Sequence, residues 1–200
     1  MKPISTIGFD CYGTLLESHG SKEAYKLLYR IIARYSKIID RKSYVTDILT
    51  RKFRSIREIM TYYGALNIPM NEINMLEHKF QESISGISIK PGAWELLDTL
   101  KRSWYKLFLS ANVTSAYAEA PKALGIEQCM DSIHYSCNTG IIKPDKRAFT
   151  QSMRYLDSTS EHTIFIGNDS NDTLEWTKNC WIPLFHIDDF LSSPQSILNP

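Results

Sequence analysis

The sequence has few cysteines, no long hydrophobic run and almost no net charge. Its four cysteines are widely spaced and form no CxxC pair, so neither a disulfide scaffold nor a structural zinc site is expected. No apolar run approaches the ~18 residues of a membrane span, and residues 1–9 lack a signal-peptide pattern. The 23 basic and 22 acidic residues give no reason to expect nucleic-acid binding. We therefore expect a soluble, cytoplasmic protein without a membrane or nucleic-acid partner.

Short apolar runs alternate with segments of helix length along most of the 200 residues. The strand-like runs cover residues 4–9, 107–109, 132–136, 164–166 and 181–185. The helical patterns between the later runs cover residues 92–102, 114–124, 145–156 and 171–179. This alternation predicts an α/β fold, a parallel sheet flanked by helices. We expect the first strand in the middle of the sheet, between the second and the fourth, and Pro183 places the last run at an edge.

One region breaks the alternation. Residues 18–88 contain no convincing strand, and their apolar residues recur at helical spacing, including a pattern that runs from Val45 to Tyr63. An all-helical insertion after the first strand predicts a separate domain. We therefore expect a core domain of residues 1–17 and 89–200, and a helical cap domain of residues 18–88.

The insertion is also charged differently from the rest of the chain. Residues 20–85 hold 12 basic and 7 acidic side chains, a net charge of +5 in a protein whose total is +1. Lys26, Arg30 and Arg34 lie four residues apart, on one face of a helix. This face is either simply solvated or a positive wall that attracts anionic substrates.

Four short motifs place chemically active side chains beside the predicted strands. Asp10 follows the first strand and Ser110 ends the second. Lys143 stands at a helix entrance, where a cation is unfavourable unless it neutralises an anion. The fourth strand runs into the polar stretch 168–172. Because carboxyl ends of parallel strands share one edge, these groups are expected to meet there.

In this order and spacing, the motifs resemble those of the haloacid dehalogenase-like (HAD) hydrolase superfamily. The sequence Asp-Cys-Tyr-Gly-Thr-Leu at residues 10–15 is similar to the DxxGT(L/V) signature. Residues 91–110 resemble the segment that begins with Pro-Gly and ends in Leu-Ser, and residues 140–145 resemble the G..KPD segment. Residues 167–172 resemble the acidic fourth motif. The resemblance implies a Rossmann-like core with an inserted helical cap.

The resemblance also implies a mechanism and a set of site residues. Asp10 would attack the substrate and form a covalent intermediate, Ser110 would bind phosphoryl oxygens, and Lys143 would offset the gathered negative charge. The substrate-binding residues would be Tyr12, Thr14, Ser110 and Asn112. In the phosphatases of the family the site holds Mg²⁺, whose ligands here would be Asp10, the backbone carbonyl of Tyr12, Asn168, Asp169 and Asp172.

Departures from the family pattern leave the reaction open. Tyr12 stands where phosphatases carry a general acid, and this version of the motif resembles the metal-independent 2-haloacid dehalogenases. However, Ala111 and Phe149 depart from the dehalogenase pattern, and Asp169 adds a carboxylate that suits a metal. Asn168 replaces an acid expected in phosphatases. We expect a Mg²⁺-dependent phosphatase of a small anionic metabolite. The alternatives are a 2-haloacid dehalogenase and a catalytically weak binding protein.

Overall fold

A computed structural model describes residues 3–18, 21–36, 40–168, 171–194 and 198. The strands are β1 (Thr6–Phe9), β2 (Leu16–Glu17), β3 (Ser88–Ile89), β4 (Lys106–Ala111), β5 (Ser132–Tyr135), β6 (Thr163–Gly167) and β7 (Leu184–His186). The helices are α1 (Ser21–Tyr35), α2 (Arg41–Thr50), α3 (Ile56–Tyr62), α4 (Met70–Ser85), α5 (Ala93–Arg102), α6 (Ser115–Ala123), α7 (Ser136–Thr139), α8 (Arg147–Leu156), α9 (Asn171–Cys180) and α10 (Ile187–Ser192). None of the described helices is long and apolar enough to cross a membrane.

Five strands form a parallel sheet in the order β5-β4-β1-β6-β7. The α/β fold is therefore confirmed, with β1 between β4 and β6 as the sequence predicts. The edge position of β7 agrees with Pro183, whose missing N–H would interrupt an inner strand. This order brings the carboxyl ends of β1, β4 and β6 side by side.

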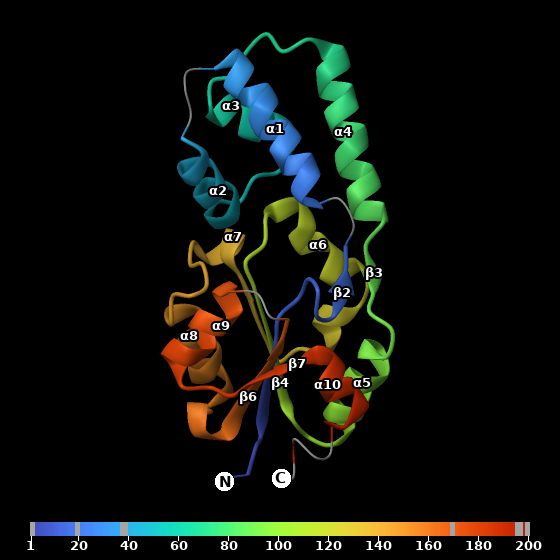
Figure 1. Ribbon diagram of the computed structural model, residues 1–200, viewed down its shortest axis with the longest axis vertical. Helices are drawn as coiled ribbons and strands as arrows, with labels where there is room; N and C mark the ends of the chain where they lie inside the picture. Colours follow the sequence, from blue (N-terminus) through green and yellow to red (C-terminus); the bar gives the residue numbers. More distant parts are fainter. Residues whose placement is uncertain (1–2, 19–20, 37–39, 169–170, 195–197, 199–200) are drawn as a thin grey trace.

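The two faces of the sheet are packed by different helices (Figure 1). On one face, Phe108 and Phe165 contact Phe149 of α8 and Trp176 of α9. Gly8 of β1 lies between the two strand phenylalanines, and a Cβ there would come within 2.2 Å of the Phe108 ring and 2.6 Å of the Phe165 ring. Glycine is therefore required at this position in the middle of the sheet.

Alternation along the strands directs the neighbouring apolar side chains to the opposite face. Ile7, Leu107 and Ile164 belong to a second, larger core cluster, together with Leu97 of α5 and Phe190 of α10. Figure 1 shows α5 and α10 on the side of the sheet opposite α8 and α9. The sheet is thus buried on both faces, as a parallel sheet in a layered α/β fold must be.

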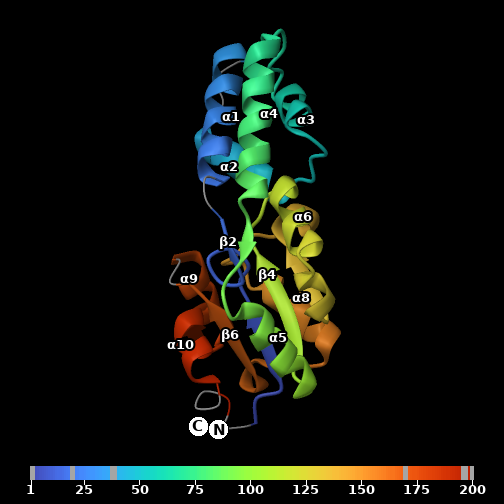
Figure 2. The same cartoon turned by 90° about the vertical axis from the view of Figure 1, so that its right-hand side faces the viewer.

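Helices α1 to α4, here called the helical unit (residues 21–85), lie together beyond one end of the sheet (Figures 1 and 2). The chain passes through the antiparallel pair β2–β3, in which Leu16 faces Ile89. The helical unit follows β2 and precedes β3. The domain boundaries expected from the sequence stay a prediction.

The helical pattern that runs from Val45 to Tyr63 forms two helices and not one continuous helix. It is divided between α2 and α3, and Arg51 between them is extended. The Ser55 side chain accepts a hydrogen bond from the Glu58 N–H, and the Glu58 carboxylate accepts one from the Arg54 N–H. Such reciprocal capping starts a new helix, so this local signal overrides the apolar periodicity.

Candidate active site

Asp10 leaves the sheet at the carboxyl end of its central strand. Its backbone N–H donates a 2.9 Å hydrogen bond to the carbonyl of Ile166 in β6. Because Phe9 pairs in register with Leu109 of β4, Asp10 comes to lie beside Ser110. The Asp10 side chain is only 13% exposed. Its carboxylate is therefore held at the sheet edge by backbone bonding rather than on a loose loop.

Lys143 reaches this carboxylate from a loop between α7 and α8. Its Nζ lies 2.9 Å from Oδ1 of Asp10 and donates a second 2.9 Å hydrogen bond to the carbonyl of Ser110. The ammonium also lies 5.4 Å from the ring centre of Phe165 and 5.6 Å from that of Trp176. The side chain is 2% exposed, so the cation is almost wholly desolvated and compensated by these contacts.

Asn112 positions Lys143 from behind. Its side-chain amide donates to the Lys143 carbonyl at 2.9 Å, and its side-chain carbonyl accepts from the Lys143 N–H at 2.7 Å. Both ends of the Asn112 side chain are thereby engaged with the Lys143 backbone. The sequence predicts Asn112 as a substrate-binding residue, whereas the geometry shows it orienting the lysine that contacts Asp10.

Two of the predicted substrate-binding hydroxyls are buried and lack a protein partner in the described part of the chain. They are Oγ of Ser110 at the end of β4 and Oγ1 of Thr14 in the loop after Asp10. A buried hydroxyl without a partner costs about 1–3 kcal/mol. Such a cost is offset when a ligand supplies the missing acceptor, which suits oxygens of an anionic substrate.

Tyr12 lies where a general acid would be expected, but its hydroxyl is engaged elsewhere. It donates a 2.6 Å hydrogen bond to the Tyr117 carbonyl in α6, and the two rings meet edge to face. Burial raises the pKa of Tyr12 well above its ordinary value, with smaller contributions from Cys11 and Tyr117. Tyr12 therefore stays protonated and neutral, and its hydroxyl hydrogen is engaged by the Tyr117 carbonyl.

The predicted metal ligands are only partly within the described residues. Asn168 Nδ2 lies 3.0 Å from the Tyr12 carbonyl oxygen, at the ends of β6 and β1. Adjacent ligands of an octahedral Mg²⁺ with bonds of about 2.1 Å are roughly 3 Å apart. With its amide turned over, Asn168 would present an oxygen at that spacing, so Asn168 and the Tyr12 carbonyl fit two adjacent ligand positions of a magnesium site.

The side chains of the other two predicted metal ligands, Asp169 and Asp172, are not described by the structure. Asp169 lies outside the described residues, and so does the side chain of Asp172, although α9 includes its backbone. Among the residues that the structure does describe, no three His, Cys, Asp or Glu side chains converge as a metal-binding group. The described part of the site thus supplies one carboxylate and neutral oxygen donors.

A pocket of about 350 Å³ lies beside Tyr12, between the sheet edge and the helical unit. Its lining combines core and helical-unit side chains: Tyr12, Asn112, Val113, Thr114, Tyr117, Tyr25, Val45, Ile48 and Leu49. The wall is mainly apolar and aromatic. Tyr25 and Tyr117 belong to none of the sequence motifs, so the sequence does not predict them as site residues. They reach the pocket through the contact between α1 and α6, where their rings pack against each other.

Comparisons with known proteins agree with this arrangement. A family model described as haloacid dehalogenase-like hydrolase matches residues 4–174. No curated protein matches the sequence. A solved structure of a predicted HAD-like family hydrolase from Porphyromonas gingivalis is 20% identical with a TM-score of 0.70, and the match covers 98% of each chain. This similarity shows the fold.

Two further solved structures carry different descriptions. A HAD phosphatase from Thermococcus onnurineus is 16% identical with a TM-score of 0.64, and the match covers 98% of each chain. A protein described as a dehalogenase is 20% identical with a TM-score of 0.62, covering 100% of this chain and 99% of the other. Structural similarity alone therefore leaves the reaction open.

Proposed function

Because the chain belongs to the haloacid dehalogenase-like hydrolases, we propose that it hydrolyses phosphorylated small molecules with Asp10 as the nucleophile. The observation that carries the proposal is the pairing of Asp10 with Lys143 beside the unpartnered hydroxyl of Ser110. A buried cation next to a nucleophilic carboxylate lowers the cost of bringing a second anion to it. The free hydroxyl is the kind of donor that a phosphoryl oxygen needs.

The proposed reaction has two steps. An Asp10 oxygen attacks phosphorus, and the bond to the leaving oxygen breaks with its electron pair going to that oxygen. Water then attacks the phosphorus of the aspartyl phosphate, releasing inorganic phosphate and a proton and restoring the carboxylate. Lys143 offsets the negative charge in both steps, while Ser110 and Thr14 donate hydrogen bonds to phosphoryl oxygens.

Mg²⁺ is part of the proposal. When bound, it would neutralise phosphoryl charge that Lys143 alone leaves unbalanced. The residues that would hold it are Asp10, the Tyr12 carbonyl and Asn168, with Asp169 and Asp172 as further predicted ligands. A cytoplasmic location belongs to the same proposal, because the four cysteines are all free thiols, as a reducing compartment favours.

The engagement of Tyr12 restricts the leaving group. Since its hydroxyl is bonded to the Tyr117 carbonyl, no described side chain at this position can protonate a departing alkoxide. Substrates whose leaving group is a weak base need no such help. We therefore propose acyl or aryl phosphates in preference to alkyl phosphates.

The same observation favours a second candidate, hydrolysis of 2-haloacids. A halide leaves without a proton, so the engagement of the Tyr12 hydroxyl does not hinder its departure. In that reaction Asp10 would attack carbon and expel halide, and water would then hydrolyse the ester. Lys143 and Ser110 would hold the substrate carboxylate.

Metal dependence separates the candidates. Phosphate release from 4-nitrophenyl phosphate and halide release from 2-chloropropionate are measured with Mg²⁺, with EDTA, and after Mg²⁺ is restored. We expect phosphate release that EDTA abolishes and Mg²⁺ restores. Halide release that resists EDTA and disappears in Asp10→Asn would establish the second candidate. No turnover in any assay, with Asp10→Asn indistinguishable from the wild type, would indicate a binding protein.

A further inference from the structure

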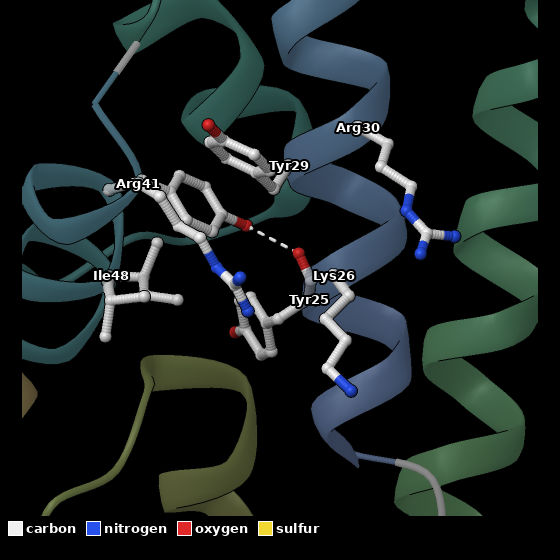
Figure 3. A pocket seen from close by; sticks show the side chains of 8 residues that line it. Tyr25, Lys26, Tyr29, Arg30, Arg41 and Ile48 are labelled. Carbon is white, nitrogen blue, oxygen red and sulfur yellow. Dashed lines mark hydrogen bonds between the residues drawn. The ribbon is translucent and has the colours of Figure 1, made fainter.

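A second pocket, of about 390 Å³, lies within the helical unit between α1 and α2 (Figure 3). It is lined by Tyr25, Lys26, Tyr29, Arg30, Arg41, Tyr44, Val45 and Ile48. Among the described residues, the lining combines three cations with three tyrosines and includes no acidic side chain. Its composition therefore differs sharply from that of the apolar pocket beside Tyr12.

Arg41 is the cation most clearly directed into this pocket. Figure 3 shows its side chain reaching from α2 towards Tyr25 of α1, whereas Arg30 extends to the other side of α1. Three of the other five arginines of the helical unit are paired, Arg34 with Glu72, Arg51 with Asp47 and Arg57 with Glu77. Arg41 has no carboxylate within 4 Å among the described residues. Its charge is thus available to a ligand.

The cations on the basic face of α1 differ in whether they have an acidic partner. Lys26 forms a 2.6 Å ion pair with Glu23, and the bond lowers the pKa of that carboxyl. Arg34, the other arginine of the basic helix face, is not among the residues that line the pocket, and it pairs with Glu72 at 3.1 Å. The basic face predicted from the sequence is therefore divided: Lys26 and Arg34 are paired, whereas Arg30, like Arg41 of α2, has no carboxylate within 4 Å among the described residues.

The two pockets adjoin, because Tyr25, Val45 and Ile48 line both of them. The shared wall is fixed: the Tyr44 hydroxyl donates a 3.0 Å hydrogen bond to the Tyr25 carbonyl, joining α2 to α1. The ring of Tyr44 also packs 5.1 Å from that of Tyr29. From Tyr12 to Arg41, an apolar and aromatic surface thus separates the catalytic carboxylate from an unpaired cation.

We propose that Arg41 binds a carboxylate at the far end of the substrate, whose apolar or aromatic body fills the pocket beside Tyr12. This inference rests on the proposed phosphatase function and names its substrate class: aryl or acyl phosphates that carry a remote carboxylate. A guanidinium can bind both carboxylate oxygens in one plane, which gives direction as well as attraction. An aryl leaving group is also a weak enough base to depart without an acid at position 12.

A binding experiment tests the subsite without relying on turnover. In the Asp10→Asn background with Mg²⁺ present, dissociation constants are measured for phenyl phosphate, 4-carboxyphenyl phosphate and 4′-carboxybiphenyl-4-yl phosphate. We expect at least one carboxylated probe to bind about tenfold more tightly than phenyl phosphate. Adding Arg41→Gln should remove that advantage. Lys42→Gln removes the same charge from the neighbouring position, outside the pocket lining, and should leave it unchanged.

The possible outcomes separate this inference from the function on which it rests. Equal affinity for all three probes, or an equal loss in Arg41→Gln and Lys42→Gln, would overturn the subsite. If the subsite is overturned but the wild type still hydrolyses phenyl phosphate, the phosphatase proposal remains supported. Conversely, an advantage that depends on Arg41, without hydrolysis by the wild type, would support the subsite and contradict the phosphatase proposal.

Discussion

The hydroxyl of Tyr12 donates a 2.6 Å hydrogen bond to the backbone carbonyl of Tyr117. This bond joins the loop that follows Asp10 to α6. The hydrogen bond holds the Tyr12 side chain at the position where a general acid would act. It also occupies the hydroxyl hydrogen, which is the only acidic proton of that side chain. Among the described residues, the sheet edge therefore brings together the proposed nucleophile Asp10 and the cation of Lys143, and Tyr12 cannot serve as the acid.

Replacing Tyr12 with Asp should widen the range of leaving groups. A carboxylic acid at this position could protonate an alkoxide, and general acid catalysis contributes about 10²–10⁴ in rate. We expect kcat/KM for alkyl phosphates to rise by at least about tenfold in Tyr12→Asp, and that for 4-nitrophenyl phosphate to change little. Steady-state kinetics on a series of phosphates with graded leaving-group pKa values measures both.

Tyr12→Asn is the matched control, because it removes the same ring but supplies no acid. It should leave the dependence on leaving-group pKa as steep as in the wild type. An equal gain in the Asn and Asp variants would mean that space, not proton donation, limits alkyl phosphates. The melting temperatures of both variants must be compared, because each loses the bond to Tyr117.

The ion pair between Asp10 and Lys143 should couple the two residues in stability as well as in activity. Both side chains are largely buried, so removing one leaves the other charge poorly compensated. In a cycle of Asp10→Asn, Lys143→Met and the double variant, we expect a coupling free energy of unfolding of about 1–3 kcal/mol. Urea denaturation measures it. Additive effects would show that the Ser110 carbonyl and the two aromatic rings alone accommodate the lysine.

A buried contact ties the helical unit to the core. Ser83 near the end of α4 hydrogen-bonds to the Tyr117 hydroxyl of α6, and both side chains are buried. Tyr117→Phe should cost about 1 kcal/mol of unfolding free energy, and Ser83→Ala should cost more if the tyrosine hydroxyl is left without a partner. The double variant should be no less stable than Ser83→Ala alone, because it removes both partners. A sum of the two single effects would contradict this.

His134 should make the protein less stable in mild acid. Burial lowers the pKa of its imidazole, the nearby Lys143 lowers it further, and the hydrogen bond to the Ile141 carbonyl opposes both. The unfolded chain therefore binds a proton at higher pH than the folded one. The stability that neutral His134 contributes is complete above pH ~6.5 and is lost as the pH falls towards the lowered value.

The slope should not exceed about 1.4 kcal/mol per pH unit for this one proton. Melting temperatures between pH 8 and pH 5 test it, and His134→Gln should reduce the slope. The control is His78→Gln, since His78 lies on α4 with 75% of its side chain exposed. A slope that changes in the control but not in His134→Gln would contradict the assignment.

Much of the fold follows from short-range pattern. Apolar runs such as Ile164–Ile166 indicate strands buried on both faces of a parallel sheet. The central position of the first strand agrees with motif residues, such as Asp10 and Ser110, that meet at one edge of that sheet. The break between α2 and α3 does not follow from the apolar pattern, because capping by Ser55 and Glu58 starts a new helix within a continuous apolar stripe.

Some features of the candidate site can likewise be predicted from the sequence and others cannot. The meeting of Asp10, Ser110 and Lys143 is predictable, because each follows a strand or occupies a motif that sequence order brings to one edge. The bond from Tyr12 to Tyr117 and the bracing of Lys143 by Asn112 are not. They depend on how α6 and a distant loop pack against the sheet, which leaves no local trace in the sequence.

Trapping the covalent intermediate tests the central claim most directly. The wild type is mixed with excess 4-nitrophenyl phosphate and Mg²⁺, quenched in acid during turnover, digested and analysed by mass spectrometry. The account predicts one added phosphoryl group on the peptide that contains Asp10, removed by hydroxylamine and absent in Asp10→Asn. Sustained turnover with no phosphoryl group on Asp10, or with one on a different residue, would contradict it.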